Sequence, residues 1–290
     1  MPSASRSTSS SGASADGPPG CEAQPASRMD MINRIKNRGL SIVGSITEYA
    51  NLASTPRGGC GKMPEKYLQS ACLMDSACLY IVATPIGNLK DISQRALDIL
   101  NTVDLIAAED TRHSGKLLKH YGISTKLMAL HEHNEEQRIQ FCLDRLQEGQ
   151  SIALISDAGT PLVSDPGYHL VKNVRESGIS VSPIPGASAL TAALSCAGLA
   201  SDAFVFQGFP AAKHSSRIKQ LEALRDESRT MVFYEAPHRI LETISDMHTV
   251  FGPERQAVLA REMTKVHETF LSGKLESLHS QIEADTNQQR

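Results

Sequence analysis

Residues 79–88 read LYIVATPIGN and join an apolar run to a turn. The apolar run Leu79–Ala83 has the length and composition of a short buried strand, and Thr84–Asn88 is rich in turn-forming residues. Apolar residues at helical spacing follow over residues 92–100. This strand–turn–helix unit predicts an α/β fold.

The same alternation repeats downstream. Further strands are predicted over residues 103–107, 126–130, 152–155 and 181–184, with helices over 112–121, 134–149, from 165 onward and 186–199. Strands that alternate with helices predict βαβ units and a mostly parallel sheet.

Residues typical of helix ends mark several boundaries. Asp91 is the predicted N-cap of the first helix and Asn134 of the third, because each has Gln three residues on, as in a capping box. Asp165 is the predicted cap of the fourth helix, with Pro166 in its first turn. Gly122 is placed to end the second helix.

The pattern changes after Gly198. Strands are predicted over 204–209, 230–234, 257–260 and 268–271, with a helix near 239–247 and a helix-like stretch at the end. We therefore predict two α/β domains, 79–199 and 200–290, the second with a partly antiparallel sheet.

The first 78 residues are predicted to be a disordered or weakly structured extension. Ser, Ala, Gly and Pro make up 20 of residues 1–28, and such a stretch buries too little apolar surface to offset its ordering entropy. Residues 29–78 leave three interpretations open: a short amphipathic helix, an unattached arm, or translation that begins at Met74.

Composition excludes several classes of protein. Charged residues are 21%, the net charge is −3, and no apolar run is long enough to span a membrane. The six cysteines form no CxxC pair, which argues against a disulfide framework and a zinc site. No apolar segment of a signal peptide follows the N-terminus, so we expect a cytoplasmic protein.

Three polar turns are candidates for a binding site. In an open α/β sheet, ligands bind at the carboxyl ends of strands, where the turns 84–91, 109–113 and 157–167 follow the first, second and fourth strands. Neither GxGxxG nor GxxxxGK[ST] is present, so the usual dinucleotide and P-loop signatures are absent.

Six blocks in order carry a resemblance to a known family. They are 79–92 (LYIVATPIGNLKDI), 107–114 (AAEDTRHS), 156–167 (SDAGTPLVSDPG), 183–188 (PIPGAS), 233–239 (FYEAPHR) and 261–265 (REMTK). From residue 79 onward the chain resembles the ribosomal RNA small subunit methyltransferase I family, which is part of the tetrapyrrole-methylase-like class.

The resemblance implies a function. The family uses S-adenosylmethionine, bound in a cleft between two α/β domains, to methylate the ribose 2′-oxygen of a cytidine in 16S rRNA of the small ribosomal subunit. It works as a homodimer without a metal. The family also continues past residue 290 with a last strand and a basic helical domain, so the chain resembles a truncated member.

The resemblance also implies residues that bind the cofactor. They come from the turns after four strands: Pro85, Gly87, Asn88, Asp157, Ala158, Gly159, Thr160, Pro161, Pro185, Gly186, Ala187, Tyr234 and Glu235. Pro185–Ala187 are expected to start a helix whose N–H groups face the cleft. For Tyr234 and Glu235, strand packing and a surface ion pair are the alternative.

Glu109, Asp110, Arg112 and His113 are the candidate catalytic residues. A ribose hydroxyl is a poor nucleophile until a base removes its proton, and either Glu109 or Asp110 is the candidate base. Arg112 is the candidate for binding an RNA phosphate. The alternative is an ordinary helix start with acidic residues near its N-terminus.

Charge gives little support to RNA binding, because residues 79–290 carry 21 Lys and Arg against 26 Asp and Glu. The compact basic cluster Lys213, His214, Arg217 and Lys219 is either a phosphate contact or a solvated helix face.

Three further interpretations stay open. His131 and His133 suit a polar cleft wall better than a metal site, because no third ligand is suitably spaced. Glu262, Lys265 and Glu268 form either a salt network or a cleft edge. The alternatives to the rRNA enzyme are a methyltransferase for a tetrapyrrole or another small acceptor, and an inactive cofactor-binding fragment.

Overall fold

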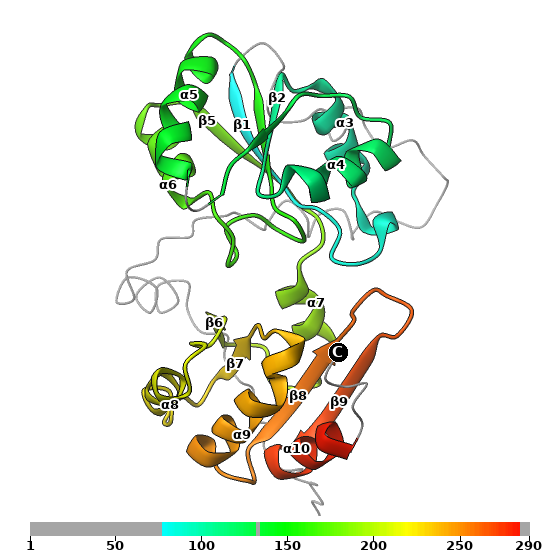
Figure 1. Ribbon diagram of the computed structural model, residues 1–290, viewed down its shortest axis with the longest axis vertical. Coiled ribbons are helices and arrows are strands. Elements are labelled where there is room, and N and C mark those ends of the chain that lie inside the picture. Colours follow the sequence, from blue (N-terminus) through cyan, green and yellow to red (C-terminus); the bar gives the residue numbers. More distant parts are fainter. Residues whose placement is uncertain (1–76, 132–133, 285–290) are drawn as a thin grey trace, which may run out of the picture. The chain divides into compact units, whose positions relative to one another are not determined.

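The computed structural model describes residues 77–131 and 134–284 (Figure 1). These residues belong to one compact unit, Lys66–Arg290. The predicted extension over 1–78, with its three interpretations, lies outside the described residues as far as residue 76. Its predicted end is wrong by one residue, because Cys78 is the fully buried first residue of β1.

Five parallel strands confirm the predicted sheet. They are β1 (Cys78–Val82), β2 (Leu105–Ala108), β3 (Leu127–Ala129), β4 (Ile152–Ile155) and β5 (Ser180–Ile184), in the order β3-β2-β4-β1-β5. Strands β1, β2 and β4 are buried almost throughout, as expected for a parallel sheet covered on both faces. Pro183 lies in the edge strand β5, where a missing N–H is tolerated.

Helices cover both faces of this sheet (Figure 1). Helices α3 (Gln94–Thr102) and α4 (Thr111–His120) pack on one face, and α5 (Glu135–Gln147) and α6 (Tyr168–Glu176) pack on the other. Side chains of β1 alternate between the two cores: Tyr80 and Val82 join the first, and Leu79 joins the second. The period of two in β1 therefore builds a three-layer arrangement.

Three helices begin or are capped differently from the prediction. Ser93, not Asp91, caps α3, and its side chain accepts a hydrogen bond from the backbone N–H of Ala96. Asn134 is the N-cap of α5, but its side chain accepts from His131 N instead of capping the helix. Helix α6 begins two residues after Pro166, at Tyr168, with Gly167 at the N-cap.

The elements after β5 do not extend the five-stranded parallel sheet. A short helix α7 (Ala189–Cys196) leads to β6 (Phe204–Gly208), α8 (His214–Glu222), β7 (Thr230–Phe233), the 3₁₀ turn η3 (Pro237–Arg239), α9 (Ile240–Phe251), β8 (Gln256–Arg261), β9 (Thr269–Lys274) and α10 (Leu275–Ala284). The predicted single sheet is instead two two-stranded sheets: β6 and β7 pair in parallel, and β8 and β9 pair antiparallel.

A third hydrophobic core lies in this later part of the chain. Ile244 of α9 packs with Leu275, Leu278 and Ile282 of α10, and residues of β8 and β9 flank them. The predicted boundary between domains 79–199 and 200–290 stays a prediction, because the described residues form part of one compact unit.

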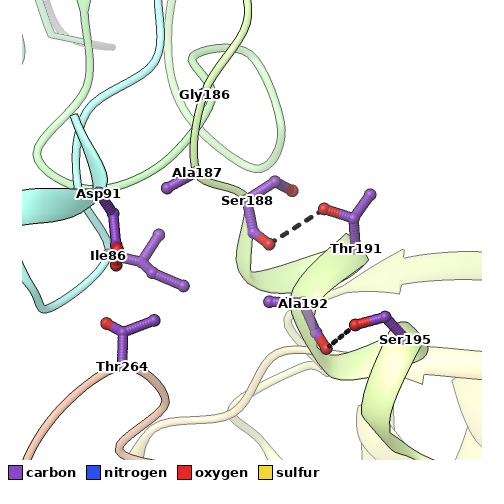
Figure 2. Close-up of a pocket in the computed structure, with 9 residues that line it drawn as sticks. All are labelled: Ile86, Asp91, Gly186, Ala187, Ser188, Thr191, Ala192, Ser195 and Thr264. Carbon is purple, nitrogen blue, oxygen red and sulfur yellow. Dashed lines mark hydrogen bonds between the residues drawn. The ribbon is translucent and has the colours of Figure 1, made fainter. Parts of the chain in front are cut away.

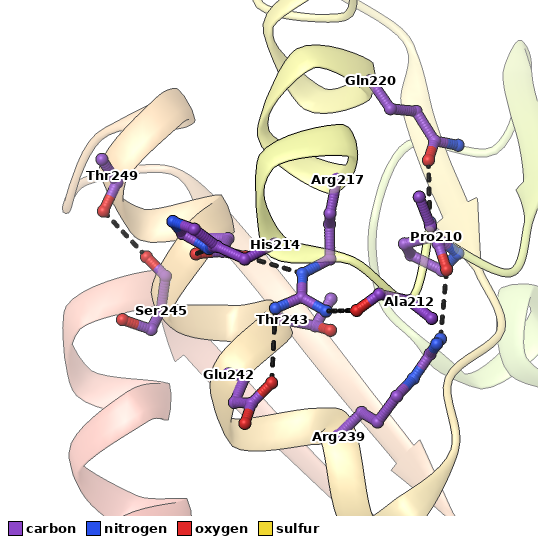
Figure 3. Close-up of polar contacts among 12 residues, drawn as sticks. Pro210, Ala212, His214, Arg217, Gln220, Arg239, Glu242, Thr243, Ser245 and Thr249 are labelled. Carbon is purple, nitrogen blue, oxygen red and sulfur yellow. Dashed lines mark hydrogen bonds and ion pairs between the residues drawn. The ribbon is translucent and has the colours of Figure 1, made fainter.

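An ion pair joins α8 to α9 (Figure 3). Arg217 is 1% exposed, and its Nε donates to Oδ2 of Asp246, a side chain only 9% exposed, at 2.6 Å. Its other nitrogens lie 3.3 Å from the carbonyl of Ala212 and 3.5 Å from exposed Glu242. Asp246 also contacts His214 Nδ1. Arg217 is thus a buried structural residue.

We expect Asp246→Ala to destabilise the protein by about 3–5 kcal/mol in urea unfolding, because it leaves the Arg217 guanidinium buried without its main partner. The double variant Arg217→Met/Asp246→Leu should lose far less stability, since no charge remains buried. Glu242→Gln is the control and should cost less than about 1 kcal/mol, because that carboxylate is exposed. Equal losses in the single and double variants would contradict this account.

Candidate functional site

The three polar turns meet at the carboxyl ends of the strands of the parallel sheet. Strand β4 lies between β2 and β1, so the turn after β4 lies between the other two. Thr84 N donates to Gly159 O at 2.8 Å, and Gly159 N donates to Thr84 O at 3.0 Å. The backbone N–H of Asp110 donates to Asp157 Oδ1 at 3.2 Å. The predicted meeting of these turns is confirmed.

Gly159 is glycine for a conformational reason. Its φ is +90°, and a Cβ there would lie 3.3 Å from Ile86 Cγ2. Side chains rarely adopt this backbone conformation, so another residue would be strained. Thr84, beside it, is buried and donates its hydroxyl to Ser156 O at 3.1 Å. The turns after β1 and β4 are thereby held together at their bases.

Glu109, Asp157 and Asp165 bring three carboxylates together. Burial raises the pKa of Glu109, and the charges of Asp165 and Asp157 raise it further. Burial also raises the pKa of Asp165, although a hydrogen bond from Ser156 opposes the shift. The raised pKa values of Glu109 and Asp165 mean that these two carboxylates hold protons more readily than free carboxylates do, and the clustered charges attract cations.

Asp110 has the opposite electrostatic environment. It is the N-cap of α4 and accepts hydrogen bonds from Arg112 N at 2.8 Å and from the Arg112 guanidinium. These hydrogen bonds lower the pKa of Asp110 to about 2. The predicted catalytic residues therefore separate into the partly buried Glu109 and the more exposed group of Asp110, Arg112 and His113.

The predicted helix start at Pro185–Ala187 is wrong. Helix α7 begins at Ala189 with Ser188 at its N-cap, so these three residues form a non-helical link between β5 and α7. The carbonyl of Ala187 accepts a hydrogen bond from the Thr160 hydroxyl at 3.2 Å. A Cβ on Gly186 would lie 3.0 Å from Ala83 Cβ, so the link runs close to the end of β1.

A pocket of about 430 Å³ opens beside this link (Figure 2). Two of the predicted residues, Gly186 and Ala187, line it. The others that line it are Ile86, Asp91, Ser188, Thr191, Ala192, Ser195 and Thr264. Hydroxyl groups, small side chains and one carboxylate therefore form its surface.

The other predicted residues of the first and third turns surround this region without lining the pocket. Pro161 is buried, Ala158 is exposed, and exposed Asn88 accepts a hydrogen bond from Lys90 N. Pro85 is half-buried, and Gly87 packs closely against Lys265.

Tyr234 and Glu235 differ in what they contact. Burial raises the pKa of Tyr234, and the charge of Asp165 contributes to the increase, so this ring lies near the carboxylates. Glu235 is 5% exposed and accepts hydrogen bonds from Arg239 Nε at 2.8 Å and Thr243 Oγ1 at 2.6 Å. Its contacts match the ion-pair alternative, although the pair is buried and not at the surface.

The sequence contained a signal for the missed pocket residues. Ser188, Thr191, Ala192 and Ser195 have the spacing i, i+3, i+4, i+7, which places small side chains on one helix face. Thr264 lies in the block REMTK, where the charged residues Glu262 and Lys265 give the stronger signal. Asp165 precedes Pro166 and therefore resembles a helix cap, which gives no sign of its position near Glu109.

Three other interpretations can now be assessed. Arg217 is buried against Asp246 and so does not belong to an exposed basic cluster (Figure 3). The other three predicted members, Lys213, His214 and Lys219, are exposed. His133 lies outside the described residues, and within residues 77–131 and 134–284 no three His, Cys, Asp or Glu side chains are arranged so that they could hold a metal ion. The helices within these ranges are all too short or too polar to cross a membrane.

The chain matches known proteins over the described region. The family model for Tetrapyrrole (Corrin/Porphyrin) Methylases matches residues 78–279. A ribosomal RNA small subunit methyltransferase I from Pseudomonas aeruginosa is 57% identical over 217 residues, which cover 75% of this chain and 77% of that protein. The protein of the same name from Escherichia coli O157:H7 is 54% identical, covering 73% and 74% of the two chains.

Solved structures show the same fold at low identity. A diphthine synthase superposes with a TM-score of 0.56 at 17% identity and covers 70% of this chain and 84% of its own. The cobalt precorrin-4 methyltransferase CbiF superposes with a TM-score of 0.53 at 14% identity, covering 73% and 91% of the two chains. The family match and the close relatives together show that the chain belongs to the tetrapyrrole methylase family, and within it to the ribosomal RNA small subunit methyltransferase I group.

Proposed function

We propose that the chain is an S-adenosylmethionine-dependent methyltransferase acting on the ribose 2′-oxygen of a cytidine in 16S rRNA of the small ribosomal subunit. The observation that carries this proposal is 54–57% identity to small-subunit rRNA methyltransferases I over about three quarters of both chains. That the methylated atom is the 2′-oxygen of a cytidine is inferred from the resemblance of the six sequence blocks.

The residues of the site fit S-adenosylmethionine. The pocket volume of about 430 Å³ lies within the range of roughly 300–1,000 Å³ typical of small-molecule sites. Its hydroxyl groups suit a ribose. The carboxylates of Glu109, Asp157 and Asp165 are available to a cation, and they connect to the pocket through the turn that contains Gly159 and Thr160. When bound, S-adenosylmethionine supplies an electrophilic methyl group on a sulfonium.

Glu109 is the better candidate for the general base. A base works best when its pKa lies near the working pH, and the pKa of Glu109 is raised whereas that of Asp110 is lowered to about 2. Asp110 is also occupied by the N-cap and by Arg112. Glu109 would take the proton of the ribose hydroxyl, and Asp110 would position Arg112.

Arg112 is the candidate contact for an RNA phosphate. Its side chain is 89% exposed, and Asp110 fixes one edge of the guanidinium while the remaining N–H groups face solvent. His113 is exposed one residue further along α4 and is available to the same strand of RNA. These contacts would hold the acceptor by its backbone, leaving Glu109 for the hydroxyl.

The tetrapyrrole alternative has weaker support. The solved methyltransferases of that class are similar to this chain in fold alone, at 14–19% identity.

We also propose that the protein acts in the cytoplasm, because that is where a ribosomal substrate is found.

A methyl-mapping experiment tests the function and the base together. The full chain should methylate small-subunit particles from a strain that lacks this modification, at the 2′-oxygen of one cytidine. Glu109→Gln should lower kcat by about 10²–10⁴-fold, because it removes proton transfer while keeping shape. Asp110→Asn, the matched isosteric variant, should lose much less. Transfer to a porphyrinoid but not to RNA would contradict the proposal, and equal losses would contradict the choice of base.

Stability should depend on pH through the same two residues. The raised pKa of Glu109 means that the folded state binds a proton more tightly than the unfolded state does. Stability is therefore lost as the pH rises from the ordinary value of 4.5 through the raised pKa. In urea unfolding, Glu109→Gln should be more stable than wild type at pH 8 and no more stable at pH 4. Asp110→Asn should be less stable at both, because its native pKa is lowered. At pH 8, a Glu109→Gln variant less stable than wild type, or an Asp110→Asn variant more stable than wild type, would contradict the electrostatic environment assigned to that residue.

We also propose that the chain forms a homodimer. Phe204, the first residue of β6, is 42% exposed, and Phe209, just after its last residue, is 54% exposed, so two large apolar rings on this segment are available to a partner. Light scattering should give twice the mass of one chain. A monomer at micromolar concentration would rule out a stable dimer.

A further inference from the structure

The turn after β6 holds Phe209 between two anchored neighbours. The backbone N–H of Tyr234 donates to the carbonyl of Gly208 at 2.9 Å, and Gly208 has φ +65°, a conformation that favours glycine. On the other side of Phe209, the Arg239 guanidinium donates to the carbonyl of Pro210 at 3.1 Å (Figure 3). Gly208 and Pro210 are both buried. The backbone that carries Phe209 is therefore fixed in place.

The next two residues of the turn are held as well. The backbone N–H of Ala211 donates to Gln220 Oε1 at 3.0 Å, and buried Arg217 donates to the carbonyl of Ala212 at 3.3 Å (Figure 3). Side chains from α8 thus hold the turn that leads into α8. A turn that is already ordered loses little further freedom when a ligand binds to it, which strengthens binding.

The ring of Phe209 is exposed although its backbone is fixed. The residue is 54% exposed, and its ring meets that of Tyr234 at an edge, with 5.5 Å between the ring centroids. The Tyr234 ring meets Phe206 in the same way at 4.9 Å. An exposed aromatic ring on a fixed support is suited to stacking with a flat aromatic ligand.

Two exposed lysines follow this ring in the sequence. Lys213 is the N-cap of α8, and Lys219 lies in its last turn. Among residues 77–131 and 134–284, no carboxylate forms an ion pair with either lysine. Proteins bind single-stranded nucleic acid with this combination, because the aromatic ring stacks on a base while cations meet the phosphates.

The ring also lies beside the carboxylates of the site. A Cβ on Gly208 would lie 3.0 Å from Ser164 Oγ, so the residue before Phe209 abuts the turn after β4. The charge of Asp165, in that same turn, contributes to the raised pKa of Tyr234, whose ring meets Phe209. A base that stacks on Phe209 is therefore close to the proposed reaction.

We propose that Phe209 stacks on a base of the RNA substrate, and that Lys213 and Lys219 bind phosphates of the same strand. This inference rests on the proposed function and extends it from the reacting hydroxyl to recognition of the strand. It assigns Phe209 to RNA and leaves Phe204, at the other end of β6, for the dimer contact.

Binding of the full chain to small-subunit particles that lack the modification tests the stacking. Phe209→Ala should raise the Kd roughly 5–150-fold, the effect of losing one stack between a base and an aromatic ring. Phe209→Tyr should stay within about 2-fold of wild type, because it keeps the ring. Phe204→Ala is the matched control, since it removes an exposed ring of the same kind from the other end of β6, and should also stay within about 2-fold. All three variants should bind S-adenosylhomocysteine as wild type does.

Salt dependence tests the two lysines. Each phosphate contact to a single strand adds about 0.7 to the slope of log Kd against log salt concentration. Lys213→Gln/Lys219→Gln should therefore lower this slope by about 1.4, whereas Phe209→Ala should leave it unchanged. Lys274→Gln, which removes an exposed lysine paired with Glu254, is the control for net charge and should also leave the slope unchanged.

Cross-linking identifies what the ring touches. With p-benzoylphenylalanine in place of Phe209, illumination of the complex should cross-link the chain to 16S rRNA. Cross-links to a ribosomal protein or to a second copy of the chain would overturn the proposal. Unchanged particle affinity in Phe209→Ala would also overturn it, as would an equal loss of affinity for S-adenosylhomocysteine or an unchanged salt slope in the lysine variant.

Failure of the proposed function would look different, since wild type itself would then not methylate the particles. If only this inference fails, wild type methylates the particles and Phe209→Ala does so with the same KM and kcat.

Discussion

Thr84 and Gly159 exchange two backbone hydrogen bonds beyond the carboxyl ends of β1 and β4, and the Thr84 hydroxyl donates to Ser156 O in the protein interior. Two turns that are 75 residues apart in the sequence are thereby held together. The other contacts of the site follow from this join. Thr160 reaches Ala187 O, and Asp157 reaches Asp110 N. Without the bridge, the pocket and the carboxylates would not share a common wall.

The same closeness creates an electrostatic conflict. Burial disfavours the charged forms of Glu109 and Asp165, and the nearby charge of Asp157 adds to the cost for both. Asp110, next in sequence, adds a smaller contribution to the raised pKa of Glu109, but its own charge is stabilised by the pair with Arg112. Adjacent carboxylates in one turn therefore acquire different proton affinities. The fold tolerates this cost because the sheet beneath the turns is buried on both faces.

The sequence predicted the parallel sheet and the meeting of the three turns because strand composition and turn residues are local signals. It misplaced helix starts where a residue competed with the expected cap. Ser93 caps α3 in place of Asp91, and the side chain of Asn134 turns to His131 instead of α5. It also could not place Thr264 beside Gly87, because that contact joins segments distant in sequence. The burial of Arg217 was hidden for the same reason: its partner, Asp246, lies on another helix.

All five strands of the parallel sheet come from residues 78–184, whereas Thr264 follows much later in the chain. Proteins are synthesised from the N-terminus at roughly 5–20 residues per second, and early segments can fold while later ones are still being made. The sheet and its rim of turns can therefore assemble on the ribosome before the β8–β9 turn exists. A nascent chain would display its acidic rim for several seconds before the last wall of the pocket could form.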